Sequence, residues 1–308
     1  MAAVSVVASI FLLIGVGMAL THAKWLDEAG AKLVARLTVD VGMFALVISN
    51  MLTEFTRERL LASAGGIAAS YLSLGLTIAL GLIVARLLKI EEHRRGVFTC
   101  MFAFSNSVFI GVPVSVGLFG DGAMPYALLY YVANTSLFWS VGCFLMARDG
   151  GRRGKIEIKR LFPMPLVAFL LSVALVLMGW TLPEFAMRAA KYLGGLVTPL
   201  SLIYTGYVIM RMIKRGSLKW HGGYAAMLIG RFALSPALLL LAVIVTPVDA
   251  FTRNVLLIQA AMPVMTQTTI AAGDRGADVE YAAGGLLLST LLSLLLIPAY
   301  MALIPYLN

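Results

Sequence analysis

Two stretches of this sequence decide its fold: SNSVFIGVPVSVGLFGDG at residues 105–122 and LIQAAMPVMTQTTIAAGDRG at residues 257–276. Each has a proline in the middle of an apolar run, Pro113 in VPV and Pro263 in MPV, with polar residues on both sides. The two prolines lie 150 residues apart, and each stretch has a Gly-Asp pair near its end. The shared pattern predicts two interrupted helices at matching places in the two halves of the chain.

Proline interrupts a helix because it lacks the backbone N–H and its ring collides with the carbonyl four residues earlier. At membrane depth, unpaired backbone is tolerated only where it is buried in protein or lines a cavity. We therefore expect broken helices that cross at Pro113 and Pro263 and aim their positive N-terminal dipole ends at a solute. The alternative is ordinary kinking, which is common in transmembrane helices. The matched polar clusters favour the crossing.

Composition places the whole chain in a membrane. The 308 residues are 60% hydrophobic and 13% charged, whereas soluble domains are about 45–50% apolar and about 25% charged. Apolar runs of membrane length recur along the chain, and they are continuous, which favours helices over a barrel. Ten segments are expected to span the membrane: 3–21, 31–51, 61–87, 96–119, 123–146, 162–180, 190–212, 222–246, 251–273 and 279–303. The predicted fold class is an all-α integral membrane protein.

A basic stretch at 147–161 divides the chain into residues 1–150 and 151–308, each with five segments. Because five is odd, the second half must enter the membrane from the opposite side, which predicts two inverted five-helix repeats. Of the 24 Lys and Arg residues, 18 fall in the loops of one side, 5 in those of the other and one, Arg231, within a segment. The positive-inside rule then predicts a multi-pass protein with both termini on the outer side.

The same distribution explains the net charge of +9, so we expect no nucleic-acid partner. The three histidines lie in loops or at helix ends, and no Cys/His spacing suits a metal. An intramembrane hydrolase would need catalytic groups at depth. We therefore expect no enzyme, no metal and no cofactor, and expect the lipid bilayer and a small solute as partners.

Several motifs carry a family resemblance. Asn106 precedes Gly111-Val112-Pro113, and the fifth segment is tyrosine-rich at 130–142. Thr198-Pro199-Leu200 is followed by Gly206, Arg231 by Pro236, and Ala261-Met262-Pro263 by the tenth segment. In this order the motifs resemble the auxin efflux carrier family, especially its short bacterial members, which are similar to malonate and other organic-anion permeases.

The resemblance implies the ten-helix fold that is shared with bile-acid:sodium symporters, with broken helices 4 and 9 crossing. Helices 3–5 and 8–10 would form a core domain, and helices 1, 2, 6 and 7 a scaffold that often makes a homodimer. The core would move like an elevator. The implied substrates are small organic anions, such as malonate, malate or an auxin-like acid, and the implied location is the bacterial inner membrane.

The polar residues around the two prolines are the candidate substrate-binding residues. We expect Asn106, Thr266 and Gln267 to donate hydrogen bonds to a substrate carboxylate. The whole candidate set is Asn106, Ser107, Pro113, Tyr131, Asn134, Tyr204, Pro263, Thr266 and Gln267. Hydrogen bonding between helices alone is the alternative role for such residues.

Asp40 and Arg231 are the two charges predicted to lie well inside the bilayer, each about 13 Å from the surface at 1.5 Å per residue. Such charges are usually paired or functional. We expect the two to lie near each other and to act in gating or coupling, or Arg231 to hold a substrate carboxylate. The alternative is that each satisfies a local partner.

The sequence thus predicts a secondary transporter. H⁺ through Asp40, Na⁺ on backbone carbonyls, and simple uniport all remain open for the driving force. The alternatives are a sodium-coupled symporter of the bile-acid type, or a channel or non-transporting sensor. A channel should have a continuous polar face, whereas the polar residues of this chain concentrate at two places.

Overall fold

The computed structural model describes residues 2–151, 164–216 and 220–303. The described part is built from helices, and its strand-type pairing is limited to one isolated bridge between Ser105 and Val264. Most of the basic stretch that was expected to divide the chain lies outside the described residues. The fold is therefore all-helical where it is described.

The helices follow the order of the predicted apolar segments, and several segments contain two or three consecutive helical pieces. In chain order the pieces are α1 (Ala2–His22); α2 (Glu28–Arg36), η1 (Leu37–Gly42) and α3 (Met43–Glu54); α4 (Arg57–Ala62) and α5 (Ala64–Leu87); η2 (Glu92–Arg94), α6 (Arg95–Ala103), η3 (Ser107–Gly111) and α7 (Val112–Phe119); η4 (Asp121–Ala123), α8 (Met124–Leu137), η5 (Phe138–Gly142) and α9 (Cys143–Asp149); α11 (Met164–Met178); α12 (Glu184–Gly195) and α13 (Val197–Lys214); α14 (Tyr224–Ile229), η6 (Gly230–Leu234) and α15 (Ser235–Ile244); α16 (Ala250–Ala260) and α17 (Gln267–Arg275); and α18 (Val279–Leu303).

Within the described residues, five helical stretches are long and apolar enough to cross a membrane: Arg57–Leu87, Asp121–Asp149, Glu184–Lys214, Tyr224–Ile244 and Val279–Tyr300. Shorter apolar helices cover Ala8–His22, Ser107–Phe119 and Met164–Met178. Lipid offers no hydrogen bonds to backbone groups, so helices of this kind are the structure that a membrane allows. The architecture is that of an integral membrane protein.

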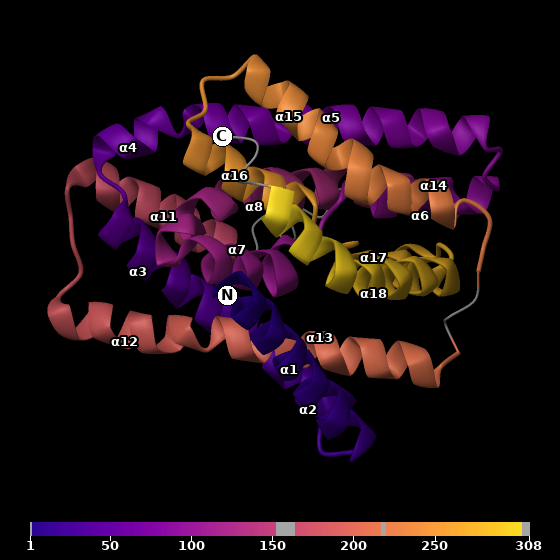
Figure 1. Cartoon of the computed structure of the whole chain (residues 1–308), viewed down its shortest axis with the longest axis horizontal. Helices are drawn as coiled ribbons and strands as arrows, with labels where there is room; N and C mark the ends of the chain where they lie inside the picture. The colour runs from indigo at the N-terminus through magenta and orange to yellow at the C-terminus, as the bar shows by residue number, and fades with distance from the viewer. Residues whose placement is uncertain (1, 152–163, 217–219, 304–308) are drawn as a thin grey trace.

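The helices pack in two groups (Figure 1). In one group, α1 and α2 pack against α13, and α3 packs against α11 and α12. In the other group, α5 packs against α6, α8 and α15, while α17 and α18 pack against each other and against α6. The broken helices α6–α7 and α16–α17 belong to the second group, and α13 contacts η3, α7 and α18 across the boundary.

Glycine allows the closest crossing in the first group. A Cβ atom on Gly17 of α1 would lie 2.1 Å from the carbonyl oxygen of Ile203, and one on Gly206 of α13 would lie 2.1 Å from that of Ile14. Both distances are far below van der Waals contact. The backbones of α1 and α13 therefore touch at a point where only glycine fits, as in helix pairs of membrane proteins.

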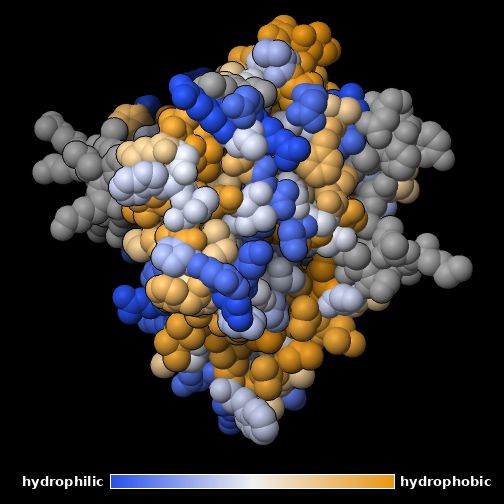
Figure 2. Space-filling model, turned by 90° about the vertical axis from the view of Figure 1, so that its left-hand side faces the viewer, coloured by the Kyte–Doolittle hydropathy of each residue, from blue (hydrophilic) through white to orange (hydrophobic). Residues whose placement is uncertain are grey.

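Polar side chains gather at the ends of the helices. Figure 2 shows the end that lies at the left in Figure 1, where hydrophilic residues form a band through the middle of the face and hydrophobic residues lie beside it. Arg57, Glu58 and Glu184 are exposed charged residues at the starts of α4 and α12. This arrangement suits a molecule whose helix ends face water and whose sides face lipid.

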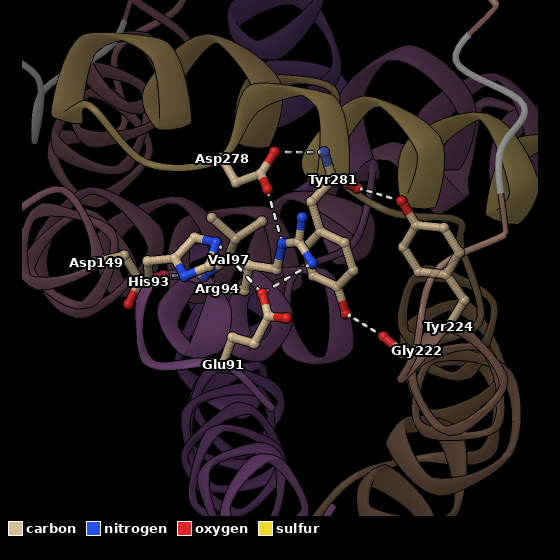
Figure 3. A network of polar contacts seen from close by, with 9 residues as sticks. All are labelled: Glu91, His93, Arg94, Val97, Asp149, Gly222, Tyr224, Asp278 and Tyr281. Carbon is tan, nitrogen blue, oxygen red and sulfur yellow. Dashed lines mark hydrogen bonds and ion pairs between the residues drawn. The ribbon is translucent and has the colours of Figure 1, made fainter. Parts of the chain in front are cut away.

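At the opposite end, a polar network ties together the starts of α6, α14 and α18 (Figure 3). Arg94 donates from Nε to the Oδ2 atom of Asp278 at 2.7 Å, and its guanidinium also pairs with Glu91. The Tyr281 ring stacks on Tyr224, with 5.0 Å between ring centroids. The Tyr224 hydroxyl donates to the Tyr281 carbonyl at 2.7 Å. Three helices from distant parts of the sequence are thereby held in one arrangement.

Asp149 at the end of α9 adds a fourth helix to this assembly. Its two carboxylate oxygens accept the backbone N–H groups of Gly96 and Val97, each at 2.9 Å. These N–H groups belong to the first turn of α6, where no partner exists within the helix. Asp149 therefore caps α6 from another helix. It holds the start of the fourth segment and the end of the fifth segment together.

Candidate functional site

The fourth and ninth segments both unwind, and their unwound stretches pair with each other. α6 ends at Ala103 before η3 begins at Ser107, and α16 ends at Ala260 before α17 begins at Gln267. Asn106 donates its backbone N–H to the Pro263 carbonyl at 2.8 Å, and Met265 donates to the Phe104 carbonyl at 3.1 Å. These two bonds form a short antiparallel pairing inside a helical protein. The pairing satisfies backbone groups that the broken helices leave open.

Asn134 of α8 pairs with the other edge of this crossover. Its Oδ1 atom accepts the Ser105 backbone N–H at 3.1 Å, and its Nδ2 atom donates to the Ser105 carbonyl at 3.0 Å and to the Ser107 hydroxyl at 3.1 Å. The Asn134 side chain is fully buried. One amide side chain thus satisfies both backbone groups of Ser105, as a neighbouring strand would.

Ser289 of α18 has a related role on the other half of the crossover. Its hydroxyl accepts the Val264 backbone N–H at 3.1 Å and donates to the Leu286 carbonyl of its own helix. The fifth and tenth segments therefore each contribute a side chain that holds one unwound stretch. Asn134 could be predicted as a candidate from the sequence, but Ser289 could not, because a serine within a helix does not by itself indicate a role in the site.

Asn106 and Thr266 join the start of η3 to the start of α17. The Asn106 Nδ2 atom donates to the Thr266 hydroxyl at 2.9 Å, and its Oδ1 atom accepts the Phe109 backbone N–H at 3.2 Å. Thr266 directly precedes α17, and Asn106 directly precedes η3. Since helix N-termini carry partial positive charge, this pair marks the place where two such ends meet.

The prediction that the fourth segment breaks at Pro113 is wrong. Pro113 is buried within the first turn of α7, and the unwound stretch lies at Phe104–Asn106. The five residues Ser107–Gly111 form a π turn, in which the Gly111 N–H bonds to the Asn106 carbonyl at 2.9 Å. Because the π turn directly before Pro113 is wider than an α turn, it gives the proline ring room beside the preceding carbonyls, and the helix continues through Pro113 without unwinding. Pro263, in contrast, lies in the unwound stretch between α16 and α17.

Gln259 supports the crossover from the last turn of α16. It is fully buried and donates from Nε2 to the Ser115 hydroxyl of α7 at 3.1 Å. A Cβ atom on Gly111 would lie 2.4 Å from the Gln259 Oε1 atom. Gly111 therefore leaves room for the Gln259 amide, which a larger residue at this position would displace from its place beside α7.

The expected pairing of Asp40 with Arg231 is also wrong. Arg231 is fully buried, and its guanidinium donates to the carbonyls of Phe102 and Ala260 and to the Ser235 hydroxyl. Asp40 lies in η1 and pairs loosely with Arg36, at 3.9 Å. Counting residues from the membrane surface predicts depth but not the side of the helix, and the two residues belong to different helix groups.

Two adjoining cavities lie between the helix groups. The smaller one, of about 180 Å³, is lined by Asp40, Phe109, Tyr204, Thr266 and Gln267, together with four neighbours from α2, η1 and α17. The larger one, of about 320 Å³, shares Tyr204, Thr266 and Ile270 with it. Both cavities reach Thr266, the partner of Asn106.

The mouth of the larger cavity is basic. Its charged residues are Lys32, Arg211, Arg215 and Glu28, so three basic groups and one carboxylate give a net charge of +2. Hydrogen bonds from Lys32 and Arg211 lower the pKa of Glu28 below its usual range. In the sequence, the three basic residues indicate only the topology. Their gathering at one cavity depends on the packing of α2 against α13 and could not be predicted.

The candidate residues thus divide into two sets. Tyr204, Thr266, Gln267 and Asp40 line a cavity, and Asn106 lies directly behind Thr266. The others are buried in the crossover or around it and are not among the lining residues of these two cavities: Ser107, Pro113, Tyr131, Asn134 and Pro263. Phe109 was missed, although its ring contacts that of Tyr204, with 4.9 Å between centroids.

The site offers hydrogen-bonding groups and aromatic rings to a solute. It consists of amide and hydroxyl groups, helix N-termini and aromatic rings, with the Asp40 carboxylate beside Arg36. Within the described residues, no three His, Cys, Asp or Glu side chains lie together as metal ligands would. The arrangement can recognise a polar solute and hold it between two groups of helices.

Comparison with known proteins agrees with this description. The model of a family described as membrane transport protein matches residues 2–301. The chain is 28% identical to an uncharacterized transporter of Methanothermobacter thermautotrophicus over 312 residues, which covers 97% of this chain and 98% of the relative. It is 26% identical to an uncharacterized transporter of Methanocaldococcus jannaschii over 221 residues, or 70% of each chain. The resemblance to auxin efflux carriers is therefore confirmed, and the chain belongs to this family of multi-pass membrane transport proteins.

Proposed function

We propose that this protein is a secondary transporter that carries a small organic anion, such as a mono- or dicarboxylate, by alternating access. The observation that carries the proposal is the cavity that reaches Thr266, because Thr266 is bonded to Asn106 where the two broken helices meet. A solute in this cavity would contact both halves of the crossover. Family membership supports transport, and the contents of the cavity support the class of substrate.

Three features favour an anion. The cavity ends at the starts of η3 and α17, whose N–H groups and dipoles attract negative charge. Its mouth has a net charge of +2, which would steer anions inward. Asp40 beside it is compensated by Arg36. The smaller cavity, of about 180 Å³, lies below the range of about 300–1,000 Å³ typical of drug-sized ligands, which favours a small solute.

The packing supports a moving core. The crossover belongs to the group of α5, α6, α8, α15, α17 and α18, whereas Tyr204 and Asp40 belong to the group of α1, α2, α3 and α13. In our proposal the group that contains the crossover is the core domain, and the group of α1, α2, α3 and α13, together with α11 and α12, is the scaffold. The Phe109–Tyr204 ring contact crosses the boundary and would break as the core moves like an elevator.

The same proposal includes ten membrane spans in two inverted repeats, residues 1–150 and 151–308, with both termini outside a plasma membrane. The basic mouth of the cavity would then face the cytoplasm, because Lys32, Arg211 and Arg215 lie at or near helix ends that the positive-inside rule assigns to that side. A homodimer through the scaffold is the corresponding assembly.

The test is uptake of labelled mono- and dicarboxylates into proteoliposomes, with and without imposed H⁺ and Na⁺ gradients. Saturable uptake identifies a carrier, whereas conductance without saturation would identify a channel and overturn the proposal. Asn106→Ala and Thr266→Ala are expected to lower kcat/KM by about ten-fold or more, since each loses a hydrogen bond to a charged group worth about 1.5–3 kcal/mol.

Matched controls use the same residue types away from the cavity. Asn50 donates to the carbonyl of Leu46 in its own helix, and Thr246 donates to that of Ala242. Asn50→Ala and Thr246→Ala are expected to transport like the unmodified protein. If they lose as much activity as the Asn106 and Thr266 variants, the assignment of the site is wrong.

A further inference from the structure

Arg231 occupies an unusual position behind the crossover. Its guanidinium donates from Nη1 to the Phe102 carbonyl at 3.4 Å and from Nη2 to the Ala260 carbonyl at 2.5 Å. Phe102 lies in the last turn of α6, and Ala260 is the last residue of α16. One side chain therefore touches the C-terminal ends of both broken helices.

The charges at this place balance without a carboxylate. A helix C-terminus carries about −0.5 of an elementary charge, so two such ends present about −1. Arg231 supplies +1, is fully buried, and forms no ion pair with a carboxylate of the described residues. Ser235, one turn further along, donates to the same Ala260 carbonyl at 3.3 Å. The acceptors are carbonyls and a hydroxyl, the groups that bind a metal cation at broken helices in other transporters.

We infer that Arg231 is a built-in cation that holds the two broken helices together in the place of a bound metal ion, so that the crossover forms without Na⁺. Arg231 is a positioning residue, because it lines neither cavity and acts on the substrate site through α6 and α16. The consequence for transport, that uptake does not require Na⁺, rests on the proposed function. The consequence for stability does not.

The first test measures the thermal stability of the purified protein in detergent and needs no substrate. In the unmodified protein, Tm should be the same in sodium, potassium and choline chloride at equal ionic strength. Arg231→Met, which keeps the length but loses charge and donors, should lower Tm by about 5 °C or more. Arg231→Lys should retain more stability than Arg231→Met, because it keeps the charge.

Rescue separates a cation role from a packing role. Arg231→Ala leaves room for a small cation, so guanidinium at concentrations too low to denature should raise its Tm, and choline should not. Ser235→Ala is the matched control: it removes a hydroxyl from the same cluster but leaves the charge, and its Tm should not respond to guanidinium. A variant that merely lost packing would show no selective rescue.

Three results would overturn the inference. One is a Tm of the unmodified protein that rises in sodium relative to choline. The others are an Arg231→Met variant as stable as the unmodified protein, and an Arg231→Ala variant that ignores guanidinium. If Arg231→Ala does not fold, the sodium comparison and the Arg231→Lys and Arg231→Met pair still decide.

The second test is uptake in proteoliposomes with choline in place of sodium on both sides. Equal rates are expected for the unmodified protein, and a sodium requirement would contradict the inference. If no organic anion is taken up in either salt, the proposed function fails, whereas the stability test still decides the role of Arg231.

Discussion

At the scale of one residue, Asn134 shows how a buried side chain can stabilise an unwound helix in a membrane protein. An amide side chain carries a donor and an acceptor in the same arrangement as a peptide group. Asn134 uses both on Ser105, and its donor also reaches Ser107. Without it, buried backbone groups of Ser105 would lose their partners, and each such loss costs about 1–3 kcal/mol.

Asn134→Ala is therefore expected to destabilise the protein by about 2–4 kcal/mol, because it leaves both backbone groups of Ser105 unsatisfied in a buried place. The measurement is the Tm of the purified variant in detergent. Asn134→Asp should be nearly as harmful, since a carboxylate cannot donate to the Ser105 carbonyl. Asn50→Ala serves as the control, and an Asn134→Ala variant of similar stability to it would contradict this role.

At the scale of elements, the broken helices depend on their neighbours at both ends. The starts of α6, α14 and α18 are held by the network around Arg94, Asp278 and Tyr281 (Figure 3). The middle is held by Asn134, Ser289 and Arg231. A half-helix of about ten residues is only marginally stable in isolation. In the proposed mechanism, the core can therefore move as one body only if these contacts persist.

The Asp278 carboxylate gives this network a predictable pH dependence. Burial alone would raise the pKa of Asp278, but the Tyr281 N–H and the Arg94 guanidinium outweigh it and lower this pKa below its usual range. A lowered pKa stabilises the folded state above the unfolded pKa of about 3.9, and this stabilisation is lost as the pH falls through the folded value.

Asp278→Asn is accordingly expected to lower stability by about 1–2 kcal/mol near neutral pH, and the difference from the unmodified protein should shrink below about pH 4. The measurement is Tm in detergent as a function of pH. Asp121→Asn, at an exposed carboxylate of η4, should show little difference at any pH. A Tm difference for Asp278→Asn that grows on acidification would show that the sign is wrong.

At the scale of the whole molecule, two adjoining cavities with a basic mouth lie between the two helix groups. The mouth gathers charges from α2 and from the end of α13, and the cavities reach the starts of α17 and η3. Exposed charges of this kind act mainly by steering, so salt should screen them. The mouth is expected to set how readily an anion enters and to leave the later steps unchanged.

Arg215→Gln is expected to raise KM for the transported anion by about two- to five-fold and to leave kcat almost unchanged. The effect should diminish at high ionic strength, and the measurement is initial uptake rates in proteoliposomes at low and high salt. Lys191→Gln removes one exposed charge from α12, away from the mouth, and should leave KM as it was. Equal effects of the two variants would show that only net charge matters.

Much of this site could be predicted from residues alone. The polar clusters around Pro113 and Pro263 marked the two broken helices, and Asn106, Thr266 and Gln267 were found in those clusters. Asn134 was found in the tyrosine-rich fifth segment. Hydrophobic runs and proline chemistry act along the chain, so they are readable without a structure. The exact place of the fourth-segment break was not readable, because a π turn accommodates Pro113 and shifts the unwinding to Phe104–Asn106.

By itself, the sequence determined that the chain is helical, that it belongs in a membrane and that two helices are interrupted, since each follows from local hydrophobicity and backbone chemistry. Only the tertiary structure decided which charges meet. Arg231 faces the ends of α6 and α16, and Asp40 faces a cavity beside Thr266. The physical reason is that depth follows from counting residues, whereas the direction of a side chain depends on how each helix is rotated against its neighbours.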